Sequence, residues 1–147
     1  MNDLRPYYTV AAQICAFFTD HGFTLEQACG VVANADAASG LRLCALGDDA
    51  HGFGLFQLPP ERLSLIRAGR GVDLKNAPAA EQCAGVLWEL NHCERRAMIA
   101  LREATTAFDA GHDFCRYYQR PGDTRQYQIR GDKAEGWRKY FRAHPLP

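Results

Sequence analysis

Residues 24–57 read TLEQACGVVANADAASGLRLCALGDDAHGFGLFQ and contain a helix start, a helix stop and a glycine-rich loop. Thr24 followed three positions later by Gln27 is a capping box, in which two side chains satisfy the free amides at a helix N-terminus. Gly40 is typical of a helix C-terminus, because glycine adopts the left-handed conformation at little cost. Apolar residues recur between them at intervals of three and four, so the stretch predicts a helix ending near Ser39.

The flanking sequence predicts a mainly α fold with six or seven helices. Residues 41–58 hold short apolar steps among glycines and aspartates, which predicts a loop or a small β insertion with a strand at Gly54–Gln57. Asp132 and Glu135 have the spacing of a second capping box and predict a helix that starts there. The other helices are expected at residues 7–19, 60–68, 78–92, 97–108 and 109–118.

The composition is that of one globular domain spanning residues 1–147. Hydrophobic residues make up 47% and charged residues 23%, which excludes a disordered chain. No apolar run approaches the roughly 20 residues of a membrane span. The longest such run, residues 10–18, has no basic leader before it, so we expect no signal peptide and synthesis in the cytoplasm.

The cysteine spacing predicts no metal site, and the charge distribution does not decide between two kinds of partner. Six cysteines occur without a C-x-x-C motif or zinc-type spacing, so we expect no metal site and mostly reduced, buried thiols. Up to Cys115 the net charge is −5, and from Arg116 onward it is +5. A basic end can steer a protein to an anionic polymer, or it can be a solvated face paired with the acidic part. No helix-turn-helix, zinc or RNA-binding motif accompanies it, so no nucleic-acid partner is expected.

The order of several short motifs resembles one known family. The motifs are Gln27-Ala28, Gly30, Asn34, Ser39-Gly40, Gly47-Asp48 and Gly54-Leu55-Phe56-Gln57, followed by residues 88–91 and 117–121. Together they resemble the lysozyme superfamily, most closely the phage-tail lysozyme-like peptidoglycan hydrolases, over about residues 11–121. The resemblance implies an α+β lysozyme-like fold.

Position 38 departs from the family pattern. The resemblance implies a catalytic glutamate there, but the chain has Ala38, which cannot donate a proton. Asp36 is no substitute, because two residues turn a helix by about 200°. Ala38 is either an introduced replacement of a glutamate or the native residue of a pseudoenzyme. Leu58 stands where the family often has Trp.

The remaining candidate residues each have a functional and a structural interpretation. Asp48 can assist at the anomeric carbon or can simply stabilise a turn. Glu89 can line the cleft or hold a loop, and His51 can contact sugar or be a polar loop residue. Gln57 is expected to bind an N-acetyl group through its amide. Aromatic rings can stack on sugars or belong to the core; the candidates are Phe53, Phe56, Tyr117 and Tyr118.

The resemblance also implies an activity and partners. The parent reaction is cleavage of the β-1,4 bond between N-acetylmuramic acid and N-acetylglucosamine, by hydrolysis or transglycosylation and without a cofactor. The expected partner is the peptidoglycan glycan strand, reached through a phage tail, a holin or a secretion apparatus. Two alternatives remain open: a non-catalytic glycan-binding module and a structural tail component.

Overall fold

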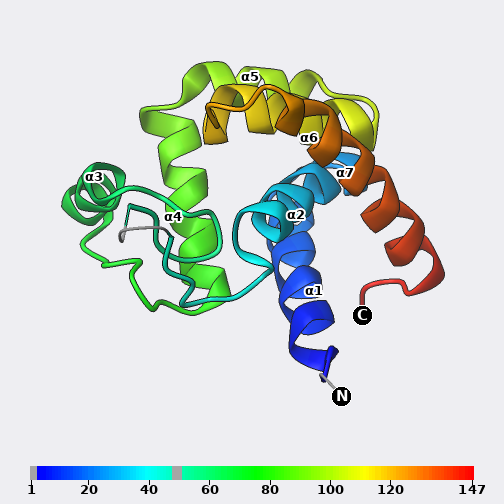
Figure 1. Cartoon of the computed structure of the whole chain (residues 1–147), viewed down its shortest axis with the longest axis horizontal. Coiled ribbons are helices and arrows are strands. Elements are labelled where there is room, and N and C mark those ends of the chain that lie inside the picture. The colour runs from blue at the N-terminus through cyan, green and yellow to red at the C-terminus, as the bar shows by residue number, and fades with distance from the viewer. Residues whose placement is uncertain (1–2, 48–50) are drawn as a thin grey trace.

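The computed structural model describes residues 3–47 and 51–147, and it is mainly α-helical as the sequence predicts. The elements in order are α1 (Arg5–Asp20), α2 (Leu25–Ser39), α3 (Pro60–Arg70), α4 (Ala79–His92), α5 (Arg95–Glu103), α6 (Ala107–Phe114), the π-helical turn η2 (Cys115–Gln119) and α7 (Arg125–Ala143). In Figure 1, α3 and α4 form one half of the molecule and α1 and the end of α7 the other, with α2 between them and α5 and α6 across the top. No helix in the described part of the chain is both long and apolar enough to span a membrane.

Helix α2 is the central element, and both of its ends agree with the sequence prediction. The Thr24 hydroxyl accepts from the Gln27 amide and the Gln27 side chain accepts from the Thr24 amide, which is the expected capping box. Gly40 ends the helix in the left-handed conformation, with φ of 64°. The helix is packed against α1, α6 and α7 and is buried over most of its surface. A helix that is enclosed on most sides needs small or apolar residues around its circumference.

The packing of α2 depends on two glycines that bring backbones together. A Cβ atom on Gly30 would lie 2.5 Å from the Ala110 carbonyl carbon of α6. A Cβ atom on Gly111 would lie 2.5 Å from the Arg130 carbonyl oxygen of α7. Helices α2, α6 and α7 therefore meet at a distance that larger residues at these two positions would prevent.

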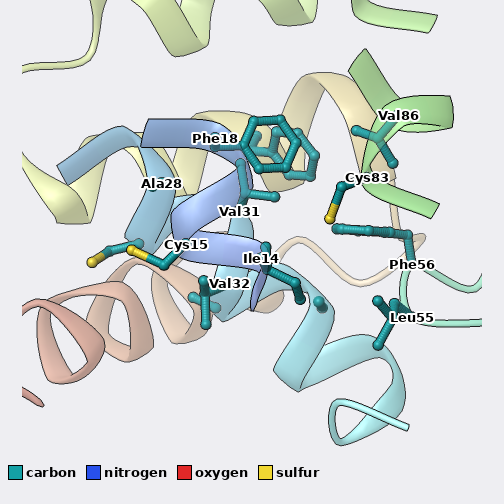
Figure 2. Packing of buried hydrophobic residues seen from close by; sticks show 14 of the residues in the cluster. Ile14, Cys15, Phe18, Ala28, Val31, Val32, Leu55, Phe56, Cys83 and Val86 are labelled. Atoms are coloured by element: carbon teal, nitrogen blue, oxygen red, sulfur yellow. The ribbon is translucent and has the colours of Figure 1, made fainter. Parts of the chain in front are cut away.

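The apolar core continues from the helices into the loop region. Figure 2 shows Ile14 and Phe18 of α1 beside Val31 and Val32 of α2, with Leu55 and Phe56 of the loop facing this cluster. Side chains of all these residues are at most 2% exposed. The loop is thus part of the same core as α1 and α2. All six cysteines are free; Cys15, Cys29, Cys83 and Cys115 are buried, whereas Cys44 and Cys93 are exposed.

The structure corrects the expected strand at Gly54–Gln57. Only isolated antiparallel bridges occur in the described part of this region, between Leu46 and Phe53 and between Phe53 and Leu58. Residues 54–57 form the turn that joins the second pair. The turn is held by Gln82 of α4, whose Oε1 accepts from the Leu55 amide and whose Nε2 donates to the Leu43 carbonyl. A side chain from a distant helix therefore replaces the partner strand.

The expected helix start at Asp132–Glu135 is also wrong. Helix α7 begins seven residues earlier, at Arg125, and runs through this stretch. The Glu135 carboxylate accepts from the Phe108 amide, so it caps the first turn of α6 and not of its own helix. The helix is continuous because its buried residues follow one stripe against α2 and α6; they are Arg130, Ala134, Trp137 and Phe141.

A third difference concerns the boundary between α5 and α6. The sequence predicts a helix up to about Phe108, whereas α5 ends at Glu103 and α6 starts at Ala107. The Thr106 hydroxyl accepts from the Asp109 amide and so acts as the N-cap of α6. Three residues between the helices allow the chain to change direction there.

Candidate active site

Position 38 lies near the C-terminal end of α2, one helical turn after Asn34. Residues four apart in a helix lie on the same face, so Asn34 identifies what surrounds the side of α2 that carries Ala38. Ala38 is half-buried. Asp36 lies on a different side, where its carboxylate accepts from the Tyr7 hydroxyl and the Trp137 indole. Position 38 thus shares the Asn34 face, whereas Asp36 does not.

Polar contacts link the Asn34 face to the turn at residues 54–57. The Asn34 amide nitrogen donates to the Gly111 carbonyl, and its oxygen accepts from Arg130 Nη1 at 3.1 Å. Arg130 Nη1 also donates to Gln119 Oε1 at 3.1 Å, and Gln119 Nε2 donates to the Phe56 carbonyl at 2.9 Å. This chain of hydrogen bonds joins α2, α7, η2 and the turn at residues 54–57.

Arg130 is the charged group of this chain. Its side chain is 7% exposed, and its side-chain hydrogen bonds in the described part of the chain go to the neutral amide oxygens of Asn34, Gln119 and Gln126. It makes no ion pair with any residue in the described ranges. Burial lowers the pKa of its guanidinium, since a low-dielectric site disfavours the charged form. Because its hydrogen-bond partners are neutral, the positive charge of Arg130 is not compensated by them and would attract an anionic group on this side of α2.

The turn brings two predicted site residues to this region in different ways. Phe56 is 2% exposed, and its ring contacts Phe114, so its side chain belongs to the core. Gln57 is half-buried with φ of 50°. Its Nε2 donates to the carbonyls of Ala45 and Gly54, both at 2.9 Å. The Gln57 amide nitrogen therefore holds the loop closed, and the contact with an N-acetyl group stays a prediction.

Two further loop candidates, His51 and Phe53, have exposed surface. His51 is exposed, and Phe53 is half-buried with the Lys75 ammonium 4.5 Å from its ring centre. Phe53 lines a cavity of about 210 Å³ between the loop and α3, together with Pro60, Leu63, Ser64, Arg67, Asp73 and Lys75. Asp48, the expected second catalytic carboxylate, lies outside the described residues.

Glu89 is part of a buried network that connects α3, α4 and η2. Its side chain is 1% exposed and receives two hydrogen bonds from Arg62, at 2.9 and 3.0 Å. The Tyr118 hydroxyl donates to the same carboxylate at 2.5 Å, and Arg62 Nη1 donates to the Tyr118 carbonyl. Burial, and then the negative charge of Glu89, raise the pKa of Tyr118 well above its usual value. In this arrangement Glu89 and Tyr118 hold the fold together and have no exposed surface for substrate.

Tyr117 is the remaining aromatic candidate and is half-buried. The Arg96 guanidinium lies 4.6 Å from its ring centre and that of Arg116 lies 5.1 Å away. Both cations lie near the Tyr117 ring, and stacking of a sugar on this ring stays a prediction.

Three residues of the site were missed by the sequence prediction: Gln82, Gln119 and Arg130. A signal for two of them exists, because Gln82 and Arg130 fall on the buried stripes of α4 and α7. A polar residue on an apolar stripe needs a partner inside the protein. Gln119 carries no such signal. In the described ranges no group of three or more His, Cys, Asp or Glu side chains could hold a metal ion.

A mainly α fold around a central helix, with a glycine-rich loop joined to that helix through α7 and η2, is the arrangement that the resemblance to a lysozyme-like domain implies. The family model of phage tail lysozyme matches residues 9–141. The chain belongs to this family of lysozyme-like peptidoglycan hydrolases, and the match extends the resemblance seen in the sequence to both sides. A comparison with curated proteins finds no match.

Proposed function

We propose that this chain binds the glycan strands of peptidoglycan, that position 38 is the general-acid position of the reaction, and that Ala38 leaves the chain without efficient cleavage. The bond concerned is the β-1,4 bond between N-acetylmuramic acid and N-acetylglucosamine. The observation that carries the proposal is the location of Ala38, one turn beyond Asn34 on the face that is joined to the loop by Arg130 and Gln119.

A glutamate at position 38 would have the environment that a proton donor needs. The position is half-buried, and Ala35, three residues earlier in α2, is fully buried. Desolvation raises the pKa of a carboxyl group and keeps it protonated for transfer to the leaving oxygen. The Arg130 charge acts in the opposite sense and limits this rise. An alanine provides neither a proton nor an acceptor.

The contacts with sugar are assigned to residues that have exposed surface. His51, Phe53 and Tyr117 remain the proposed binding residues, whereas Phe56, Gln57, Glu89 and Tyr118 shape the site through their own contacts. Asp48 or a positioned water would act at the anomeric carbon, which leaves hydrolysis and transglycosylation as two outcomes of the same site. The proposed place of action is the bacterial cell wall, with delivery by a phage tail, a holin or a secretion apparatus.

The test is a side-by-side lysis assay of the protein and its Ala38→Glu variant on purified peptidoglycan. We expect the variant to be faster by ~10²–10⁴-fold, which is the usual contribution of general acid catalysis. Ala38→Gln is the matched control, because it has the same shape without the proton, and it should stay inactive. Products with a reducing end indicate hydrolysis, and anhydro products indicate transglycosylation.

Two results of this assay would contradict the proposal in different ways. Equal activity of the protein and the Ala38→Glu variant would place the acid elsewhere. If neither is active and both sediment with peptidoglycan, the chain is a glycan-binding module with a native alanine or a structural tail component. Retained binding by the protein itself is expected, because the missing carboxyl group contributes more to the transition state than to the ground state.

A further inference from the structure

A second hollow with a built polar centre lies on another side of α2 from position 38. Its volume is about 260 Å³, below the roughly 300–1,000 Å³ of drug-sized sites. Figure 1 shows the start of α1 close to the N-terminus and the second half of α7 close to the C-terminus. The lining residues come from α1, α2 and α7 and are Tyr7, Tyr8, Asp36, Lys133, Gly136, Trp137 and Tyr140.

The polar centre is the Asp36 carboxylate, whose side chain is 8% exposed. All its described contacts go to one oxygen: Oδ2 accepts from the Tyr7 hydroxyl at 2.7 Å and the Trp137 indole at 3.1 Å, and lies 3.4 Å from Lys133 Nζ. Oδ1 has no hydrogen-bond partner among the residues that the structure describes. In the same part of the chain every fully buried side-chain N or O atom has a partner. Oδ1 is therefore open to the hollow that Asp36 lines.

The walls and the charge restrict what this hollow can hold. Tyr8 and Tyr140 stack with ring centres 4.8 Å apart, and Trp137 packs edge-on against both. Aromatic walls favour a ligand with an apolar face. The Asp36 and Lys133 charges compensate each other, so a neutral ligand is favoured over an ion. The open Oδ1 requires a hydroxyl or amide donor, and the Lys133 ammonium, 40% exposed, can donate to an acceptor.

We propose that this hollow, formed by α1, α2 and α7, binds one neutral sugar residue of the glycan as a site separate from position 38. A pyranose ring has an apolar face for Tyr8 and Tyr140, and hydroxyl groups that donate to Asp36 Oδ1 and accept from Lys133. The inference rests on the proposed function, since it takes the glycan strand as the ligand. Two contact points on one strand would raise the effective concentration of glycan at position 38.

The two tryptophans of the chain allow a direct test by NMR. The indole of Trp137 lines the proposed site, whereas Trp88 stacks on His92 in a different hollow beside Phe17 and serves as an internal control. The probe is chitotriose, a neutral β-1,4-linked N-acetylglucosamine trimer, added to the ¹⁵N-labelled full chain. We expect saturable movement of the Trp137 indole N–H signal and a stationary Trp88 signal.

Substitutions then separate the ring and carboxylate contacts. Tyr140→Ala should raise the chitotriose dissociation constant measured at Trp137 at least tenfold, and Asp36→Asn should weaken binding while keeping the shape of the site. Leu65→Ala, an exposed position on α3, is the matched control and should change nothing. Amide signals across each variant's spectrum report whether the fold is intact.

Each remaining result counts against the inference. If chitotriose moves signals of the loop at residues 51–57 and leaves Trp137 unmoved, the glycan site at position 38 stands and the second site falls. If no signal moves, both this site and the proposed glycan binding fall. If Trp137 responds to an N-acetyl-lysine methyl ester and not to chitotriose, the hollow is a cation site and the sugar assignment is wrong.

Discussion

The buried carboxylate of Glu89 provides the sharpest test of how this fold is held together. Glu89 is 1% exposed and Arg62 14% exposed, and two hydrogen bonds join them. Replacement by Gln keeps the size of the side chain and leaves the Arg62 guanidinium without its main counter-charge. Breaking a buried pair on one side costs about 3–5 kcal/mol of the free energy of unfolding. For a chain of this size, ~2–4 °C per kcal/mol then corresponds to a fall in Tm of about 6–20 °C.

Two comparison variants make this prediction specific. Glu94→Gln removes a carboxylate that lies 3.8 Å from the same Arg62 and is 17% exposed, and it should cost only about 1 kcal/mol. The pair Arg62→Leu with Glu89→Leu leaves no unpaired charge there, so it should be more stable than Glu89→Gln alone. Urea unfolding followed by circular dichroism measures all three. Equal losses for Glu89→Gln and Glu94→Gln, or a double variant no more stable than Glu89→Gln, would refute the reasoning.

Two further outcomes follow from the packing and from the buried phenols. Gly30→Ala should lower the free energy of unfolding by about 1–3 kcal/mol, because the new Cβ would lie 2.5 Å from the Ala110 backbone. Urea denaturation measures this loss. Gly136→Ala is the control and should cost little, because no atom lies within 4 Å of its new Cβ. Burial raises the pKa of Tyr7 and of Tyr118, so both stay protonated in the folded chain when unfolded phenols ionise near pH 10. The folded state then binds more protons, and stability should fall as pH rises above about 10; denaturation curves that do not change between pH 8 and 11 would contradict this.

Much of the helical framework follows from local signals. The capping box at Thr24 and the left-handed Gly40 fix both ends of α2, and Gly71 ends α3 in the same conformation. These signals work because a cap is formed by atoms within a few residues of the helix end. The location of Ala38 near the end of α2 follows from the same local reasoning.

The candidate site depends more on contacts between distant residues. The sequence allowed two interpretations of Glu89, as a residue that lines the cleft or as one that holds a loop. Its burial beneath Arg62 and Tyr118 could not be inferred, because these partners lie 27 and 29 residues away in the chain. The hydrogen bonds of the Gln57 amide nitrogen to the carbonyls of Ala45 and Gly54 could not be inferred from the sequence either. The partners of a polar side chain are chosen by tertiary proximity, which periodicity does not encode.

The local sequence was sufficient for the mainly α class and for both ends of α2. Long-range packing was needed for the turn at residues 54–57, where Gln82 replaces a partner strand, and for the start of α7, where Arg130 extends the buried stripe. It was also needed to show that Asp36 joins Trp137, 101 residues later, in a separate hollow. Helix caps are satisfied by neighbours in the chain, whereas buried polar groups are satisfied by whatever element the fold places beside them.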